Sequence, residues 1–298
     1  MKFRKLGKTG LEVSVIGVGT WQFGGEWGRQ YRQDGVDAIL DKAAEHGINL
    51  IDTAECYGDH TSESLIGDYL SRRDRNRWII ATKFGHHFHG FMDRTWDSSV
   101  AGVEAQLEKS LKALRTDMID VYQFHSGSDE DFSRPELWTM LQRQRQSGKI
   151  RHLGISIAGK GGQFQAEQAQ PVGAEVLQVV YNRLERRAEQ DFFPHAREQR
   201  LGILARVPLA SGFLSGKYAG FKSFPANDAR STFDQEKFHR WTDEVEQIRK
   251  SEVPADVSMS QWALAWCLQN PLVSAVIPGC RDVAQLESNA QAAKLVAW

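Results

Sequence analysis

Cysteine, charge of one sign and long apolar runs are all scarce in this 298-residue sequence. Its three cysteines, Cys56, Cys267 and Cys280, are too few and too scattered for a disulfide framework or a metal knuckle. A formal net charge of −1 leaves no dominant basic face for nucleic acid or a membrane surface. No apolar run reaches membrane-spanning length, and the start MKFRKLGKTG lacks a signal-peptide core. We therefore expect a cytoplasmic, enzyme-sized protein without nucleic-acid or membrane partners.

Short apolar runs rich in β-branched residues alternate with longer helical patterns along the chain. This alternation is typical of parallel strands joined by helical crossovers. Helices are predicted around residues 34–47 and 98–115, where apolar residues recur at three-to-four spacing. Strands are predicted at residues 15–20, 49–53, 78–83, 118–124, 150–156, 176–182, 202–208 and 274–279.

Eight strand–helix units in 298 residues predict a closed (β/α)8 barrel, a TIM barrel, formed by residues 1–298 as a single domain. The alternative is an open doubly wound sheet, because VSVIGVGTWQFGG resembles a dinucleotide-binding fingerprint. That alternative fails on spacing, since Gln22 stands at the third glycine position and no helical pattern begins there. We also expect an N-terminal β-hairpin from residues 3–7 and 11–14, and an extra helical segment within 218–257, between strands seven and eight.

Polar residues follow several predicted strands at the end where barrels carry their chemistry. Asp52 ends the second strand and Tyr57 follows it, Lys83 ends the third, and His125 follows the fourth. A buried Lys83 would need Asp52 as a counter-ion, and its charge would lower the pKa of Tyr57. Each residue alone could be an ordinary rim residue, but four of them at successive strand ends favour a catalytic cluster.

Several motifs along nearly the whole chain resemble the aldo-keto reductase family. They are DTAECYG (52–58), ATK (81–83), SLKALRTDMIDVYQFH (110–125), VPLASGFLSGKY (207–218) and IPGCRDVAQLESNA (277–290). The resemblance implies an NADP-dependent oxidoreductase that reduces a small-molecule aldehyde or ketone without metal, or runs the reverse oxidation. It implies that Tyr57 is the general acid, that Lys83 and Asp52 tune it, and that His125 orients and polarises the carbonyl.

The same resemblance implies the NADP-binding positions. Those around the nicotinamide and its ribose are Gly19, Thr20, Trp21, Asp52, Ser156, Gln178 and Arg206. Those on the loop that covers the pyrophosphate are Pro208, Leu209, Ser211, Gly212, Leu214, Gly216 and Lys217. Those at the adenosine end are Gly279, Arg281, Gln285 and Asn289. We expect Arg281 to select NADPH over NADH, because a guanidinium suits the extra 2′-phosphate.

Three of the departures from the family pattern concern the predicted cofactor site. Ile157 follows Ser156 where the family usually has asparagine, and Ser288 replaces the acid common before Asn289. Arg206 stands where an aromatic ring commonly stacks on the nicotinamide. A guanidinium can stack as well, and its charge would favour the reduced, uncharged nicotinamide.

Residues 84–97, FGHHFHGFMDRTWD, suggest a metal site through His86, His87, His89 and Asp93. The segment lacks an HExxH helix, and a loop gives no fixed ligand geometry, so we expect a substrate-pocket lip and no metal. We interpret Cys56, beside Tyr57, as a small packing residue.

Three functions remain open. The favoured one is an NADPH-dependent carbonyl reductase. The second is a non-catalytic nicotinamide-nucleotide-binding auxiliary or sensor protein on the same scaffold, and the third is a Schiff-base lyase with Lys83 as nucleophile. The sequence leaves the substrate, the direction of reaction and the oligomeric state undetermined.

Overall fold

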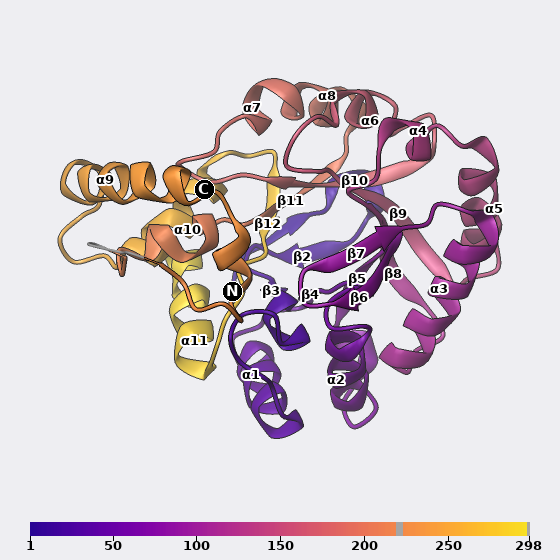
Figure 1. The fold of residues 1–298 in the computed structure, drawn as a ribbon, viewed down its shortest axis with the longest axis horizontal. Helices are drawn as coiled ribbons and strands as arrows, with labels where there is room; N and C mark the ends of the chain where they lie inside the picture. The colour runs from indigo at the N-terminus through magenta and orange to yellow at the C-terminus, as the bar shows by residue number, and fades with distance from the viewer. Residues whose placement is uncertain (219–222, 297–298) are drawn as a thin grey trace.

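Eight parallel strands form one curled sheet in this computed structural model, which describes residues 1–218 and 223–296. The strands follow the order β12-β11-β10-β9-β8-β5-β4-β3. Parallel bridges from Ile16 to Val276 and from Gly19 to Gly279 join the first strand to the last and close the sheet. The predicted (β/α)8 barrel is therefore confirmed (Figure 1). The strands are β3 (Val18–Gly19), β4 (Leu50–Asp52), β5 (Ile79–Phe84), β8 (Ile119–His125), β9 (Ile150–Ser156), β10 (Ala174–Val180), β11 (Gly202–Arg206) and β12 (Val273–Val276).

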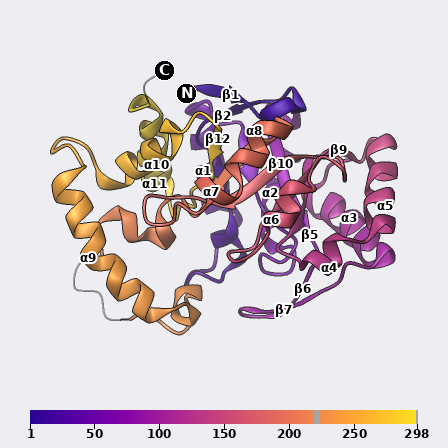
Figure 2. The ribbon, with the colours of Figure 1, turned by 90° about the horizontal axis from the view of Figure 1, so that it is seen from above.

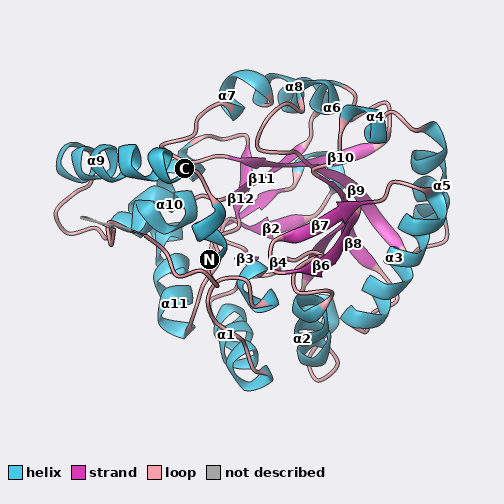
Figure 3. Ribbon diagram, in the orientation of Figure 1, coloured by secondary structure: helices cyan, strands magenta, loops and turns pink. Residues whose placement is uncertain are grey.

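Helices surround the sheet on its outer face (Figure 3). They are α1 (Gln33–Glu45), α2 (Thr61–Leu70), α3 (Val100–Leu114), α4 (Asp129–Phe132), α5 (Pro135–Gln146), α6 (Gln163–Glu167), α7 (Ala188–Asp191), α8 (Phe193–Gln199), α9 (Gln235–Ser251), α10 (Met259–Gln269) and α11 (Val283–Gln291). The stripe predicted on α3 is buried at Val103, Leu107, Leu111 and Leu114, and Ser99 caps its first turn. None of the described helices is both long and apolar enough to cross a membrane.

The lower part of the barrel is filled by apolar side chains and closed by the N-terminal hairpin. The hairpin pairs β1 (Phe3–Lys5) with β2 (Glu12–Ser14) in antiparallel fashion, as the sequence predicts. Its flanking residues Leu6 and Leu11 pack with the inward residues of the strands, including Leu50, Ala81 and Val121. Because side chains alternate along a strand, the residues two positions further on point into the next layer of the same interior. That next layer contains the polar groups of the site.

Residues 84–97 form a second hairpin, so the prediction of an irregular loop there is wrong. β6 (His86–Gly90) pairs with β7 (Asp93–Trp96), and His86 lies opposite Trp96. Figure 2 shows this hairpin at the opposite end of the barrel from β1 and β2. Both of its strands lie half exposed, so neither carries the apolar alternation by which strands are recognised in a sequence.

The extra segment between β11 and β12 is helical, as predicted, although its residues 219–222 lie outside the described part of the chain. It contains a 3-10 helix, η5 (Ala229–Thr232), and the helix α9. Phe238 and Trp241 of α9 pack against Phe213, which belongs to the 3-10 helix η4 (Ala210–Ser215). The extra segment therefore buttresses the loop that the sequence assigns to the cofactor pyrophosphate.

Candidate active site

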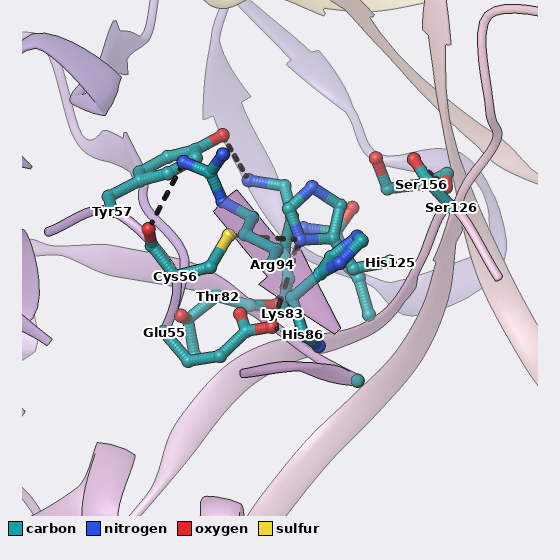
Figure 4. A network of polar contacts seen from close by, with 12 residues as sticks. Glu55, Cys56, Tyr57, Thr82, Lys83, His86, Arg94, His125, Ser126 and Ser156 are labelled. Atoms are coloured by element: carbon teal, nitrogen blue, oxygen red, sulfur yellow. Dashed lines mark hydrogen bonds and ion pairs between the residues drawn. The ribbon is translucent and has the colours of Figure 1, made fainter. Parts of the chain in front are cut away.

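Lys83 and Asp52 form a fully buried ion pair at the top of the barrel. The Lys83 ammonium lies 2.8 Å from a carboxylate oxygen of Asp52 and donates to the backbone carbonyl of Thr53 at 2.6 Å. It also lies 3.3 Å from the phenolic oxygen of Tyr57 (Figure 4). Burial alone would lower the pKa of Lys83, but Asp52 and Tyr57 outweigh it and raise the pKa above its ordinary value. Lys83 is therefore a permanent cation aimed at the phenol.

The other carboxylate oxygen of Asp52 accepts hydrogen bonds from two amides. Gln178 donates to it at 2.6 Å and Gln123 at 3.4 Å. The Ser156 hydroxyl donates to the side-chain amide oxygen of Gln178 at 3.3 Å, which connects β9 and β10 to the ion pair. Because both carboxylate oxygens of Asp52 have partners on other strands, the orientation of Asp52 is fixed from several strands.

Tyr57 is brought back over the strand ends by a tight turn. Its amide donates to the carbonyl of Ala54, and Gly58 follows with a φ of 68°. A Cβ at Gly58 would lie 2.4 Å from the carbonyl oxygen of Gly24, so only glycine fits there without a shift. The phenol ring stacks on Trp21, with centroids 5.9 Å apart and planes 21° apart.

The pKa of Tyr57 shifts in the opposite direction to the net lowering that the sequence suggests. Burial raises the pKa of Tyr57 to about 12, and Asp52 and Cys56 add to that rise. Lys83 acts in the predicted direction and lowers the pKa of Tyr57, but its effect is smaller than that of burial. The phenol therefore keeps its proton at neutral pH in this structure, which suits a proton donor.

His125 faces Tyr57 across the barrel mouth. The two rings are nearly perpendicular, with centroids 6.3 Å apart. Burial, followed by the charges of Lys83, Arg206 and Arg94, holds the pKa of His125 well below its ordinary value. A neutral imidazole carries one N–H, so His125 can donate a hydrogen bond to an uncharged acceptor such as a carbonyl oxygen.

Two of the departures from the family pattern, Ile157 and Arg206, meet in the structure. Arg206 donates to the backbone carbonyl of Ile157 at 2.9 Å, while its Nε is buried with no hydrogen-bond partner among the described residues. Burial lowers the pKa of Arg206, because its cation is removed from water. A buried donor without a partner on the predicted nicotinamide side of the site fits a ligand that completes it.

Thr20 and Gly19 hold the first strand against its neighbours. The Thr20 hydroxyl and amide both donate to the backbone carbonyl of Asp52, at 2.9 and 3.0 Å. A Cβ on Gly19 would approach the carbonyl oxygen of Ile277 to 2.6 Å, so the barrel closes through a glycine. Trp21 continues into the 3-10 helix η2 (Trp21–Gly24), and its indole N–H donates to Glu26 at 2.9 Å.

The loop after β11 has an unusual backbone. Val207, Ala210 and Ser211 all have φ near 50°, and Gly212 follows with a φ of 98°. A β-branched residue such as Val207 rarely adopts this conformation, and such strain gathers at ligand-binding segments. Pro208, Leu209, Leu214 and Gly216 lie on the same loop, and the exposed Lys217 ends it.

The predicted adenosine-end residues lie just before α11 or on it. Asp282 caps the helix, the Arg281 amide donates to Gln285 at 3.0 Å, and Asn289 donates to the Gly279 carbonyl at 3.5 Å. Arg29 and Tyr31 both donate to the carbonyl of Arg281, at 3.0 and 3.2 Å. The exposed Arg281 therefore sits beside a second arginine at a helix N-terminus, an arrangement that favours an anion.

A sequence model of the aldo/keto reductase family matches residues 15–297. The chain belongs to this family. It is 33% identical over 297 residues to the uncharacterized oxidoreductase YqkF of Bacillus subtilis, covering 98% of this chain and 91% of that protein. It is 30% identical to the aldo-keto reductase YhdN of the same organism, covering 97% and 87%.

Solved structures agree with these sequence relatives. The holo form of the aldo-keto reductase AKR11C1 from Bacillus halodurans superposes with a TM-score of 0.81 at 30% identity, covering 99% of this chain and 91% of that one. The glycerol dehydrogenase AKR11B4 from Gluconobacter oxydans gives a TM-score of 0.82 at 29% identity, covering 99% and 90%. The family carries out oxidoreduction of small-molecule carbonyl compounds and generally uses nicotinamide cofactors, so the protein is an oxidoreductase of this family.

Two features of the site were missed by sequence reasoning. Gln123 belongs to the Asp52 network, and its position two residues before His125 on the same strand face was the available signal. Arg94 of β7 forms a buried ion pair with Glu26 and lies 3.4 Å from the backbone carbonyl of Cys56. No sequence signal pointed to that pair, because the hairpin that delivers Arg94 was not predicted.

The histidines of residues 84–97 separate into different environments. The His86 ring packs edge-on against His125, with centroids 4.8 Å apart. His87 instead lies near Asp97 at 3.5 Å, and His89 contacts the Thr95 hydroxyl at 2.7 Å. Among the described residues these side chains do not converge with Asp93 on one metal position.

Proposed function

We propose that the protein reduces aldehydes or ketones to alcohols with NADPH, that Tyr57 donates the proton, and that residues 1–298 act as one unit. The observation that carries the proposal is the chain of contacts from Asp52 to Lys83 to Tyr57, at 2.8 and 3.3 Å. It joins a protonated phenol to a fixed cation at the mouth of a barrel whose family works on carbonyl compounds.

NADPH, when bound, supplies the hydride. Ser156, Gln178 and Arg206 would hold its nicotinamide end, the loop at residues 208–217 its pyrophosphate, and Arg281 its 2′-phosphate. The unpartnered Nε of Arg206 and the positive φ angles of Val207, Ala210, Ser211 and Gly212 support this fit.

The chain's own residues would handle the carbonyl oxygen. His125, neutral because of its lowered pKa, donates a hydrogen bond that orients and polarises the carbonyl. Tyr57 passes its proton to the developing alkoxide, and Lys83 stabilises the phenolate that remains. Asp52, held by Gln178 and Gln123, keeps Lys83 directed at the phenol throughout.

A Schiff-base role for Lys83 conflicts with its environment. Imine formation requires a neutral amine, whereas Asp52 and Tyr57 raise the pKa of Lys83. Borohydride treatment with a carbonyl substrate should therefore trap no adduct on Lys83. A trapped adduct would contradict the assignment of Lys83 as a fixed cation.

The deciding experiment separates catalysis from nucleotide binding. The purified chain is mixed with NADPH carrying deuterium at the transferable position and with a panel of aldehydes, ketones and dicarbonyls. We expect NADPH oxidation with deuterium at the former carbonyl carbon of the alcohol product. Tight NADPH binding without turnover on any member of the panel would favour the auxiliary or sensor function instead.

A further inference from the structure

Glu55, Cys56 and His125 bring three different metal-ligand types together beside Tyr57. One ligand atom from each lies within 4.8 Å of the other two. The Cys56 sulfur is 3.8 Å from Nδ1 of His125, and a Glu55 oxygen is 3.9 Å from the same nitrogen. Figure 4 shows these side chains converging in front of β5, next to the phenol. The carbonyl reduction described above assigns no role to Glu55 or Cys56.

The separations are close to those of a tetrahedral zinc site. Bond lengths of about 2.3 Å to sulfur and about 2.0 Å to nitrogen or oxygen place neighbouring ligand atoms roughly 3.3–3.6 Å apart. The two separations from Nδ1 of His125, 3.8 and 3.9 Å, exceed these values by roughly 0.3–0.6 Å, and the Cys56–Glu55 separation lies within 4.8 Å, so the three side chains must draw together to hold a metal. A thiolate, an imidazole and a carboxylate together form a donor set that suits Zn²⁺ and its analogue Co²⁺.

Glu55 provides a second, independent observation. Glu55 is only 2% exposed, and one of its carboxylate oxygens accepts a hydrogen bond from the backbone amide of His86 at 2.9 Å. This oxygen is also the one 3.9 Å from Nδ1 of His125, while the second carboxylate oxygen is buried with no hydrogen-bond partner among the described residues. A buried carboxylate oxygen without a donor is costly unless a cation or a water molecule completes it.

A cavity on the hairpin side reaches Glu55, one of the three residues of the cluster. This cavity of about 280 Å³ opens between the β4–α2 connection and the β6–β7 hairpin, and Glu55 and His86 form part of its wall. His60, His87 and His89 line the same cavity, so its entrance carries further groups able to bind a transition metal weakly.

We propose that Glu55, Cys56 and His125 form a reversible inhibitory site for Zn²⁺ or a similar borderline transition metal. Binding would release the thiol proton of Cys56 to solvent and draw Nδ1 of His125 toward the metal. The imidazole would then be bound to the metal and drawn from the position in which it orients a carbonyl, which slows a reaction that depends on positioning. The metal binding is independent of the proposed function, whereas the inhibition rests on it.

Two nearby cations limit the affinity. Lys83 and Arg94 both act electrostatically on Cys56, and burial raises the pKa of its thiol, so the metal must displace a tightly held proton. With three protein ligands instead of four, the site should bind more weakly than a structural zinc site and should release the ion to a chelator.

Direct binding is tested by titrating the chelator-treated full chain with Co²⁺ while recording its absorption. We expect one equivalent to bind with a thiolate-to-cobalt charge-transfer band and tetrahedral d–d bands. Cys56→Ser should abolish the charge-transfer band. Cys267→Ser is the matched control, because Cys267 is equally buried but bonds the Tyr181 carbonyl away from this cluster. A charge-transfer band that survives Cys56→Ser, or no band in the wild type, would overturn the site.

Inhibition is tested with Zn²⁺ on the NADPH-dependent turnover of the same variants. Zn²⁺ should inhibit the wild type and Cys267→Ser reversibly, with full recovery on EDTA. Cys56→Ser and Glu55→Gln should retain uninhibited turnover and need at least about tenfold more Zn²⁺ for equal inhibition, a loss of about 1.4 kcal/mol in binding. Cobalt binding without inhibition would overturn the inhibitory role. If no carbonyl substrate is turned over at all, the cobalt titration still decides the metal site.

Discussion

Two layers of the barrel interior, only two residues apart on the same strands, are built from opposite kinds of side chain. Leu50, Ala81 and Val121 lie in the lower layer, all fully buried against the N-terminal hairpin. Two positions further along their strands come Asp52, Lys83 and Gln123, which are also buried but polar. The strands are continuous, so the change is one of chemistry and not of backbone.

The difference shows how the fold separates stability from chemistry. The lower layer stabilises the fold because its apolar area is removed from water. This stabilisation depends on how well the side chains fill the available volume. The upper layer holds charged groups away from water, so each charged group needs a partner. Removing one partner leaves the other as an unpaired buried charge. Substitutions in the lower layer should therefore lower the free energy of unfolding and leave turnover unchanged. Substitutions in the upper layer should affect turnover most strongly.

The strongest test of the upper layer is Tyr57→Phe. The ring and its stacking on Trp21 remain, while the proposed proton donor is removed, so turnover should fall by about a hundred- to ten-thousand-fold. NADPH affinity and melting temperature should stay near the wild-type values. Because the pKa of Tyr57 is raised to about 12, wild-type reduction should not lose its acid between neutral pH and about pH 10.

Tyr122→Phe is the matched control for that variant. The Tyr122 hydroxyl is buried without a hydrogen-bond partner among the described residues, and its side chain belongs to the core cluster outside the barrel interior. Its removal should leave turnover unchanged and stability equal or slightly higher. Near-normal turnover in Tyr57→Phe would contradict the general-acid role.

Lys83→Met should damage both chemistry and stability. Asp52, with a side chain only 4% exposed, would lose its cation, and breaking such a pair costs about 3–5 kcal/mol. Turnover should fall and the pKa of Tyr57 should rise further, because Lys83 is the group that lowers it. Adding Asp52→Asn should recover part of the unfolding free energy but not the turnover.

The pH dependence of this pair has a definite sign. The pKa of Lys83 is higher in the folded protein than in the unfolded chain, where it is about 10.4. Its contribution to stability is therefore complete below pH 10.4 and is lost as the pH rises through the folded-state pKa. Denaturant midpoints of wild type and Lys83→Met should converge only in strongly alkaline solution; convergence at neutral pH would contradict the ion pair.

Leu6→Ala tests the lower layer. Leu6 is fully buried beneath the barrel, so the cavity left behind should cost about 2–5 kcal/mol of unfolding free energy. Turnover per folded molecule and the NADPH Michaelis constant should not change. A fall in turnover matching that of Lys83→Met would mean that the two layers are coupled, which contradicts the separation described above.

The sequence was sufficient for the parts of the fold that rest on apolar periodicity. The strands and the stripe on α3 could be predicted because burial imposes period 2 or 3.6 on their residues. The β6–β7 hairpin could not, because its half-exposed strands carry no such period. Because the hairpin was not predicted, the ion pair of Arg94 with Glu26 was not predicted either.

The site shows the same limit in another form. Residue types at strand ends pointed to Asp52, Lys83 and Tyr57, and the structure brings them together. The sign of the pKa shift of Tyr57 could not be predicted, because it depends on how far burial outweighs Lys83. Likewise, the contact of Arg206 with the Ile157 carbonyl joins two unusual residues whose proximity no spacing encodes.

Arg281→Ala should give the smallest effect, because Arg281 is exposed just before the N-cap of α11 and belongs to neither buried layer. Arg32→Ala is its matched control, since Arg32 is an exposed arginine of the same charge whose side chain is 89% exposed. An equal rise of the NADPH Michaelis constant in both variants would indicate a general electrostatic effect of the lost charge, and not the loss of a phosphate ligand.

The expected result for Arg281→Ala follows from the chemistry of the cofactor's 2′-phosphate. That group calls for a multidentate cation, and Arg29 beside Arg281 would retain part of the attraction after the substitution. A charged hydrogen bond contributes about 1.5–3 kcal/mol, so the NADPH Michaelis constant should rise roughly ten- to a hundredfold. The NADH value should stay nearly constant, because NADH lacks the phosphate. The measurement is the ratio of kcat/KM for the two cofactors at fixed ionic strength, because salt screens an exposed contact. An unchanged ratio would remove Arg281 as the phosphate ligand and direct attention to Arg29 and Lys217.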